Sequence, residues 1–86
     1  MKKICVLGLG YIGLPTALIL AKNYDVVGID INENIVNKLN KGILPFSEHE
    51  LSKLWNETKK NFIASTKMDY ADVFLISVPT PIEKTM

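Results

Sequence analysis

The chain contains 86 residues, so it can form no more than one small domain, because domains usually contain about 100–150 residues. Apolar residues make up 48% of it and charged residues 22%, which is typical of a folded chain and excludes the composition of a disordered one. The net charge is +1, so the composition indicates neither nucleic-acid binding nor binding to an anionic membrane.

Cysteine and histidine, which often serve as nucleophiles or metal ligands, occur once each. Cys5 cannot form an internal disulfide, and His49 has no second histidine or cysteine beside it. No metal site is therefore expected, and a lone thiol suits a reducing compartment, for which we predict the cytoplasm. Cys5 lies inside an apolar run, which favours a small buried core thiol over a nucleophile. His49 is expected to be a solvated residue in the first turn of a helix.

The first 21 residues predict a strand, a glycine turn and a helix. Residues 4–21 carry no charge and follow two lysines, a pattern that also resembles a signal peptide or a membrane segment. Three glycines and Pro15 interrupt this run, however, and such residues break helices. Ile4–Leu7 is a short apolar run typical of a buried parallel strand. Beyond the glycines, apolar residues recur at the spacing of one helix face, namely Leu14, Ala17, Leu18 and Ala21.

The middle of the chain predicts a second strand and a capped helix. Val26–Ile29 is an apolar run that ends at Asp30. Asn32 is a residue type that caps helix N-termini, and Gly42 is one that ends helices. These signals predict a helix over residues 33–41.

The remaining residues predict one helix and two strands. A Ser-x-x-Glu capping box at residues 47–50 opens a helix whose apolar face comprises Leu51, Leu54, Trp55 and Thr58. Residues 62–64 and 73–78 predict strands, the second apolar almost throughout. Residues 67–71 between them are too few for a full crossover helix. The alternation of strands and helices predicts an α/β fold with a parallel sheet.

Residues 8–13 read Gly-Leu-Gly-Tyr-Ile-Gly, which is the pattern GxGxxG between a predicted strand and a predicted helix. Gly8 permits the tight turn, Gly10 lets a pyrophosphate approach the backbone, and Gly13 lets the helix pack closely on the sheet. The free N–H groups of Tyr11 and Ile12 would face the phosphates at the positive end of the helix dipole. The pattern in this context predicts a dinucleotide site.

Asp30, at the end of the second predicted strand, selects among dinucleotides. A carboxylate accepts hydrogen bonds from ribose hydroxyls and repels a 2′-phosphate, and residues 31–34 add no cation. NAD is therefore predicted over NADP. An FAD site uses the same turn and is an alternative. A turn that binds nothing, with Asp30 only capping a helix, is another.

The end of the fourth predicted strand supplies two further candidates. Thr80 stands between two prolines at the carboxyl end of that strand, where ligands lie in an open parallel sheet. Its hydroxyl is predicted to meet the ribose or nicotinamide side of the cofactor, the alternative being a plain loop threonine. Val78 would line the same crevice through its backbone. The predicted cofactor-binding residues are Gly8, Gly10, Tyr11, Ile12, Gly13, Asp30, Val78 and Thr80.

Four blocks of sequence resemble the UDP-glucose/GDP-mannose dehydrogenase family: residues 8–17, 26–32, 39–51 and 71–81. Leu14-Pro15 and the Val-Pro-Thr-Pro of residues 78–81 resemble the branch that oxidises UDP-N-acetyl-D-mannosamine. UDP-glucose and UDP-N-acetylglucosamine enzymes are the alternatives. The chain departs from the family at His49-Glu50, where Pro-Gly is common, and at Ile35, where a basic residue is common.

The resemblance implies that the C6 hydroxyl of a nucleotide sugar is oxidised to a carboxylate by two NAD+, with a cysteine holding the aldehyde between the two hydride transfers. The family's catalytic cysteine, lysine, asparagine and aspartate lie far downstream, so no catalytic residue is expected in residues 1–86. Family members are commonly dimeric, so a homo-oligomer is expected for the full-length form.

The chain is therefore expected to be the N-terminal part of an NAD-binding domain, residues 1–86, without substrate or catalytic domains and inactive alone. Its predicted fold is a Rossmann-type parallel sheet with helices on both faces, truncated after its fourth strand, in the order 3-2-1-4. The exposed apolar fourth strand predicts self-association or marginal stability. A non-catalytic NAD-binding module, a remnant without a ligand and other dehydrogenases with a glycine turn remain alternatives.

Overall fold

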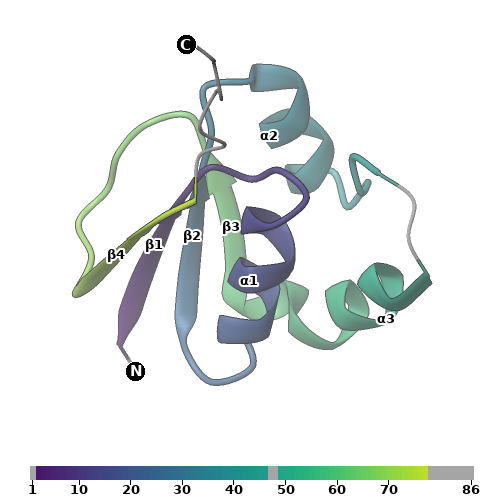
Figure 1. Ribbon diagram of the computed structural model, residues 1–86, viewed down its shortest axis with the longest axis horizontal. Coiled ribbons are helices and arrows are strands. Elements are labelled where there is room, and N and C mark those ends of the chain that lie inside the picture. The colour runs from purple at the N-terminus through teal and green to yellow at the C-terminus, as the bar shows by residue number, and fades with distance from the viewer. Residues whose placement is uncertain (1, 47–48, 78–86) are drawn as a thin grey trace, which may run out of the picture.

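The computed structural model describes residues 2–46 and 49–77, with only the backbone of His49, as a four-stranded sheet with helices packed against it (Figure 1). All neighbouring strands are parallel, and their order is β3-β2-β1-β4, which confirms the predicted 3-2-1-4 topology. The elements are β1 (Lys3–Leu7), α1 (Gly13–Leu20), β2 (Asp25–Ile29), α2 (Glu33–Asn40), α3 (His49–Thr58), the 3-10 turn η1 (Lys59–Asn61), β3 (Phe62–Ser65) and β4 (Val73–Ile76).

The register of the sheet places the ends of the two central strands side by side. Leu7, the last residue of β1, pairs with Ile29, the last residue of β2. The chain segments that follow these strands, beginning at Gly8 and Asp30, therefore leave the sheet at the same edge. In open parallel sheets this is the edge at which ligands bind.

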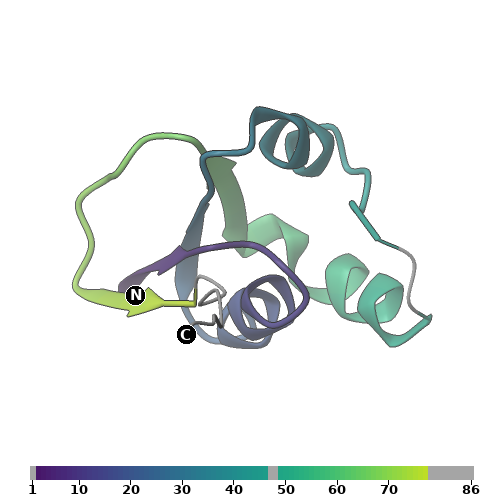
Figure 2. The same ribbon diagram turned by 45° about the horizontal axis from the view of Figure 1, so that its top comes forward.

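The three α-helices lie on one face of the sheet, as Figure 2 shows. Leu14, Ala17 and Leu18 of α1 are fully buried against it, which confirms the predicted helix face. Trp55 of α3 packs edge-on against the ring of Phe62 of β3, with the ring centroids 5.9 Å apart. Trp55 is buried and belongs to the main core cluster. Aromatic pairs of this geometry stabilise packing between elements.

The opposite face of the sheet carries a smaller apolar cluster of Cys5, Val27, Ile29 and Ala71. The β3–β4 connection, residues 66–72, is extended and passes along this side (Figure 2). We expected helices on both faces, whereas within residues 2–46 and 49–77 they cover one face. The physical reason is the short β3–β4 connection, in which the sequence already predicted no full crossover helix.

Local capping signals begin and end α2 as predicted. The side-chain oxygen of Asn32 accepts hydrogen bonds from the amides of Asn34 at 2.9 Å and Ile35 at 3.3 Å. Gly42 follows the helix with φ of 83°, a left-handed conformation that glycine adopts without steric cost. The predicted capping box of residues 47–50 includes positions outside the described residues.

The strand β4 ends at Ile76, and the rest of the predicted strand 73–78 falls partly outside the described residues. All four β4 residues are exposed, in contrast to the buried centre of β1. No helix in the described part of the chain is both long and apolar enough to cross a membrane. The charge-free run at residues 4–21 is instead divided among β1, the glycine turn and α1.

Candidate functional site

Two of the three glycines in the turn are required by the fold itself. Gly8 has φ of 101°, and its amide donates a 2.7 Å hydrogen bond to the carbonyl of Ile29. A side chain at Gly8 would be strained, because L-residues rarely adopt this region. A Cβ at Gly13 would collide with the carbonyl oxygen of Gly8. Gly13 therefore lets α1 approach the carbonyl of Gly8, the residue that directly follows β1.

Gly10 differs from both, since nothing in the fold requires a glycine there. Its φ lies outside the left-handed region, and no atom lies within 4 Å of a Cβ built on it. A side chain at Gly10 would extend into open space between the turn and the neighbouring elements. This is the observation expected of a glycine that leaves room for a ligand at the backbone.

The N-terminus of α1 presents free amides beside this open space. The first bonds of the helix run from Leu14 to the carbonyl of Gly10 and from Thr16 to that of Ile12, both 3.1 Å. Among the described residues, none accepts a hydrogen bond from the amides of Tyr11 or Ile12. These donors, at the positive end of the helix dipole, are suited to bind an anionic group.

Asp30 joins the glycine turn to the start of α2. Its Oδ2 accepts a 2.9 Å hydrogen bond from the amide of Leu9, and its Oδ1 accepts one of 2.9 Å from the amide of Asn32. A carboxylate has about four lone-pair positions, so both oxygens keep acceptor capacity for a ligand. Asp30 therefore holds the two turns together and can still bind hydroxyl groups.

A cavity of about 630 Å³ opens at Asp30; we call it the Asp30 cavity. Its lining is largely apolar, with one carboxylate and the turn backbone, which suits a flat apolar ring joined to a hydroxyl-bearing sugar. Its lining residues are Leu7, Gly8, Gly10, Ile29, Asp30, Ile31, Ile35, Thr66 and Met68.

Six lining residues of the Asp30 cavity were not among the predicted site residues: Leu7, Ile29, Ile31, Ile35, Thr66 and Met68. A sequence signal existed for Ile31, because this isoleucine directly follows Asp30 at the end of a predicted strand. In the structure its side chain is 93% exposed. Ile31 lines the cavity together with Asp30, so it offers apolar surface to a ligand bound beside the carboxylate. Thr66 and Met68 come from the β3–β4 connection and carry no such signal.

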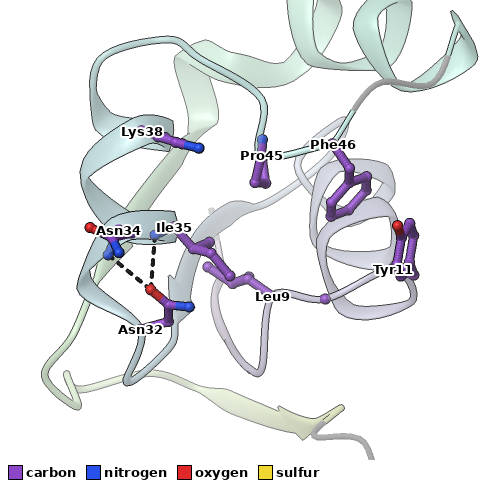
Figure 3. A pocket seen from close by; sticks show the side chains of 9 residues that line it. Leu9, Tyr11, Asn32, Asn34, Ile35, Lys38, Pro45 and Phe46 are labelled. Atoms are coloured by element: carbon purple, nitrogen blue, oxygen red, sulfur yellow. Dashed lines mark hydrogen bonds between the residues drawn. The ribbon is translucent and has the colours of Figure 1, made fainter.

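A second cavity of about 350 Å³ lies between α2, the glycine turn and residues 45–46 (Figure 3); we call it the Lys38 cavity. Its lining residues are Leu9, Gly10, Tyr11, Asn32, Asn34, Ile35, Lys38, Pro45 and Phe46. The rings of Tyr11 and Phe46 stack with centroids 4.6 Å apart, and they form one wall. The ring of Tyr11 thus borders the Lys38 cavity, and its side chain is 78% exposed.

The remaining candidates are placed as follows. Cys5 is fully buried, and burial raises the pKa of its thiol, so the thiol stays protonated and unreactive at neutral pH, as predicted. Val78 and Thr80 lie outside the described residues, as does the side chain of His49. Within the described residues, no cluster of three or more His, Cys, Asp or Glu could hold a metal ion.

The chain is similar in sequence to several nucleotide-sugar dehydrogenases. The chain is 51% identical over 84 residues to a UDP-N-acetyl-D-mannosamine dehydrogenase of Methanococcus maripaludis, covering 94% of the chain and 20% of that relative. An enzyme of the same name from Campylobacter jejuni is 46% identical, with 94% and 21% covered. The chain thus spans about a fifth of the length of these relatives.

Solved structures of nucleotide-sugar dehydrogenases are also similar to this chain in fold. The native structure of the UDP-N-acetyl-mannosamine dehydrogenase from Staphylococcus aureus matches 93% of this chain and 20% of its own with a TM-score of 0.87 and 42% identity. A ternary complex of GDP-mannose dehydrogenase from Pseudomonas aeruginosa matches 98% of the chain and 21% of its own, with a TM-score of 0.82 and 29% identity.

Residues 2–86 also match the profile described as "UDP-glucose/GDP-mannose dehydrogenase family, NAD binding domain". The open backbone at Gly10, the free amides of α1 and the carboxylate of Asp30 fit that cofactor. The chain therefore belongs to the UDP-glucose/GDP-mannose dehydrogenase family, an oxidoreductase family, and the predicted cofactor NAD is confirmed.

Proposed function

We propose that this chain binds NAD+ through the glycine turn and Asp30, as the N-terminal part of the NAD-binding domain of a nucleotide-sugar dehydrogenase. One observation carries the assignment of residues: Asp30 is bonded to the turn through the amide of Leu9, and the open backbone of Gly10 lies at the same cavity. In this arrangement the amides of Tyr11 and Ile12 bind the diphosphate, and Asp30 binds the adenosine ribose hydroxyls.

The Asp30 cavity is the proposed position of adenosine. Ile31, Ile35 and Met68 supply apolar surface for the adenine ring, next to the carboxylate that would bind the ribose. A 2′-phosphate at this carboxylate would be repelled, so NAD+ is preferred over NADP+. Val78 and Thr80 are proposed to line the nicotinamide side, on the basis of the sequence pattern alone.

The proposed reaction is oxidation of the C6 hydroxyl of UDP-N-acetyl-D-mannosamine to the uronic acid. Relatives named for this sugar are 46–51% identical to the chain, whereas an NDP-N-acetyl-D-galactosaminuronic acid dehydrogenase of Ralstonia nicotianae is 43% identical. The catalytic residues would lie in the same protein, outside residues 1–86. We propose that the full-length protein is cytoplasmic and forms a homo-oligomer. UDP-glucose and UDP-N-acetylglucosamine are the alternative substrates.

A thermal-shift titration with NAD+ and NADP+ tests the cofactor site. A site filled at 100 times its dissociation constant adds about 2.7 kcal/mol to stability. In a domain of this size that raises the unfolding midpoint by roughly 10 °C or more. We expect this shift with NAD+ and little shift with NADP+.

Two variants test the residues, each compared with its own ligand-free midpoint. Gly10→Ala should leave the ligand-free midpoint almost unchanged, because the added methyl meets no atom, yet it should abolish most of the NAD+ shift. Asp30→Ala should also lose the shift, whereas Asp25→Ala removes an exposed carboxylate at the start of β2 and should keep it. An undiminished shift in Gly10→Ala and Asp30→Ala would refute the proposed site.

The proposed substrate is tested on the full-length dehydrogenase of which this chain is proposed to be the N-terminal part, because the sugar contacts are expected outside residues 1–86. NADH formation with UDP-N-acetyl-D-mannosamine, and far less with UDP-glucose, is expected. A preference for another nucleotide sugar would overturn the substrate assignment without affecting the cofactor site.

A further inference from the structure

The Lys38 cavity adjoins the proposed diphosphate position. Gly10 and Ile35 line both this cavity and the Asp30 cavity, so the two hollows meet across the glycine turn. A ligand bound over Gly10 therefore lies at the mouth of the Lys38 cavity. The amide of Tyr11, which we propose as a diphosphate donor, also belongs to a residue of this wall.

Lys38 extends from α2 into this space. Asn34, Ile35 and Lys38 line the cavity together, because residues three and four positions apart lie on the same side of a helix. Figure 3 shows the lysine side chain reaching across the cavity toward Pro45, opposite the Tyr11–Phe46 wall. Among the described residues that line the cavity, Lys38 is the one with a charged side chain.

The charge of Lys38 suits the ligand at the neighbouring turn. A diphosphate at Gly10 would otherwise meet the neutral amides of α1 and, on its other side, the carboxylate of Asp30. A lysine on a flexible four-carbon stem can place its ammonium against such an anion as a point charge. Residues 31–34, which directly follow Asp30, contain no cation, so a cation on this side must come from further along α2.

We propose that Lys38 is a cofactor-binding residue, whose ammonium group binds the diphosphate of the dinucleotide from the α2 side of the glycine turn. This assignment rests on the proposed function. It adds to that function a second charged residue, which raises the affinity of the chain for the cofactor by binding its diphosphate. Asp30 determines the choice of ribose, whereas Lys38 contributes charge to any ligand with the same diphosphate.

The test compares NAD+, ADP and adenosine in isothermal titration with the wild-type chain and three variants. Lys38→Gln keeps most of the stem and removes the charge, and Lys38→Arg keeps the charge. Lys41→Gln is the matched control, because it removes one lysine just after the same helix, and Lys41 lines neither cavity. Lys38→Gln should weaken NAD+ and ADP about fivefold to tenfold and leave adenosine unchanged. Lys38→Arg should restore most of the affinity, and Lys41→Gln should match the wild type.

Salt dependence separates a charge effect from a structural one. Wild-type affinity for NAD+ should fall as ionic strength rises, and Lys38→Gln should show a weaker dependence, because screening acts on the charge that it lacks. Equal losses for adenosine and ADP, or equal losses in Lys38→Gln and Lys41→Gln, would overturn the assignment of Lys38. Absence of NAD+ binding by the wild-type chain would instead refute the proposed function, so the two failures are distinguishable.

Discussion

The two outer strands of the sheet, β3 and β4, differ in how their free edges are covered. The edge of β3 is closed by a side chain from α2: the amide group of Asn40 donates to the carbonyl of Ala64 at 2.9 Å and accepts from its N–H at 3.2 Å. An asparagine side chain thus takes the place of a neighbouring strand. Within the described residues, β4 pairs with β1 alone, and its other edge has no such partner.

The two strands also differ in side-chain exposure, since all four residues of β4 are exposed, whereas Phe62 and Ala64 of β3 are buried. Ile63 of β3 is 64% exposed and Ile76 of β4 is 73% exposed, so each strand carries an apolar side chain in solvent. The strands differ in the hydrogen-bonding state of the backbone, and an unpaired backbone edge is what recruits another strand. A side chain of α2 therefore blocks strand pairing at Ala64 of β3, whereas the outer edge of β4 is open to pairing within the described residues.

The largest expected effect is on stability, from Asn40→Ala. This change removes both hydrogen bonds and leaves the N–H and carbonyl of the buried Ala64 without them, which should cost about 2 kcal/mol in the free energy of unfolding. Urea unfolding measures it. Asn37→Ala, at an exposed position of the same helix, makes the same chemical change and should alter stability by less than about 0.5 kcal/mol. Similar values for the two variants would show that the Asn40 contact does not close the edge.

An intermediate effect is expected on self-association through β4. The chain should associate as its concentration rises, and Ile76→Lys should weaken that association about tenfold, because a charge on an edge strand opposes pairing. Sedimentation velocity over a range of concentrations measures this. Ile63→Lys adds the same charge at a similarly exposed position on the closed edge, so it should leave the association unchanged. A wild-type chain that stays monomeric throughout would contradict the prediction.

The smallest effect concerns the loop between the two outer strands. Lys3 Nζ lies 2.7 Å from Asp69 Oδ2, and this hydrogen bond lowers the pKa of the Asp69 carboxyl. A carboxyl whose pKa is lower in the folded state stabilises the fold above its unfolded pKa and loses that contribution as pH falls through the lowered value. The midpoint difference between wild type and Asp69→Asn should thus be small at pH 6 and should shrink as the pH falls below the ordinary pKa of an aspartate and through the lowered one. A difference that grows as the pH falls would assign it to another cause.

The sequence allowed prediction of those parts of the fold that depend on neighbouring residues. Asn32 caps α2, Gly42 ends it, and the glycine turn connects β1 to α1, all as expected from local pattern. The strand order followed from the alternation of strands and helices together with the Rossmann-type assignment that the glycine turn supports. The bonding of Asp30 to the amide of Leu9 was not predicted, because it joins two turns 21 residues apart.

The residues that sequence reasoning missed are those that become neighbours only through folding. The Lys38 cavity is lined by the glycine turn, α2 and residues 45–46. The Asp30 cavity is lined in part by Thr66 and Met68, which follow β3 in the chain. Asn40 is a comparable case, because a helical asparagine gives no local indication that it meets the edge of a strand. Helices on both faces were expected from the fold class, and the short β3–β4 connection explains why the described residues show one covered face.

Asp30 has one more consequence, in entropy. A free aspartate must give up rotamer freedom when it binds a hydroxyl, and immobilising a side chain on binding costs roughly 0.5–1.5 kcal/mol for the rotamer-rich types. The amides of Leu9 and Asn32 already fix both oxygens of Asp30 before any ligand arrives. The conformational entropy of this side chain is therefore lost when the two turns fold and not when a ligand binds. A hydroxyl group that binds Asp30 would meet an acceptor that is already ordered.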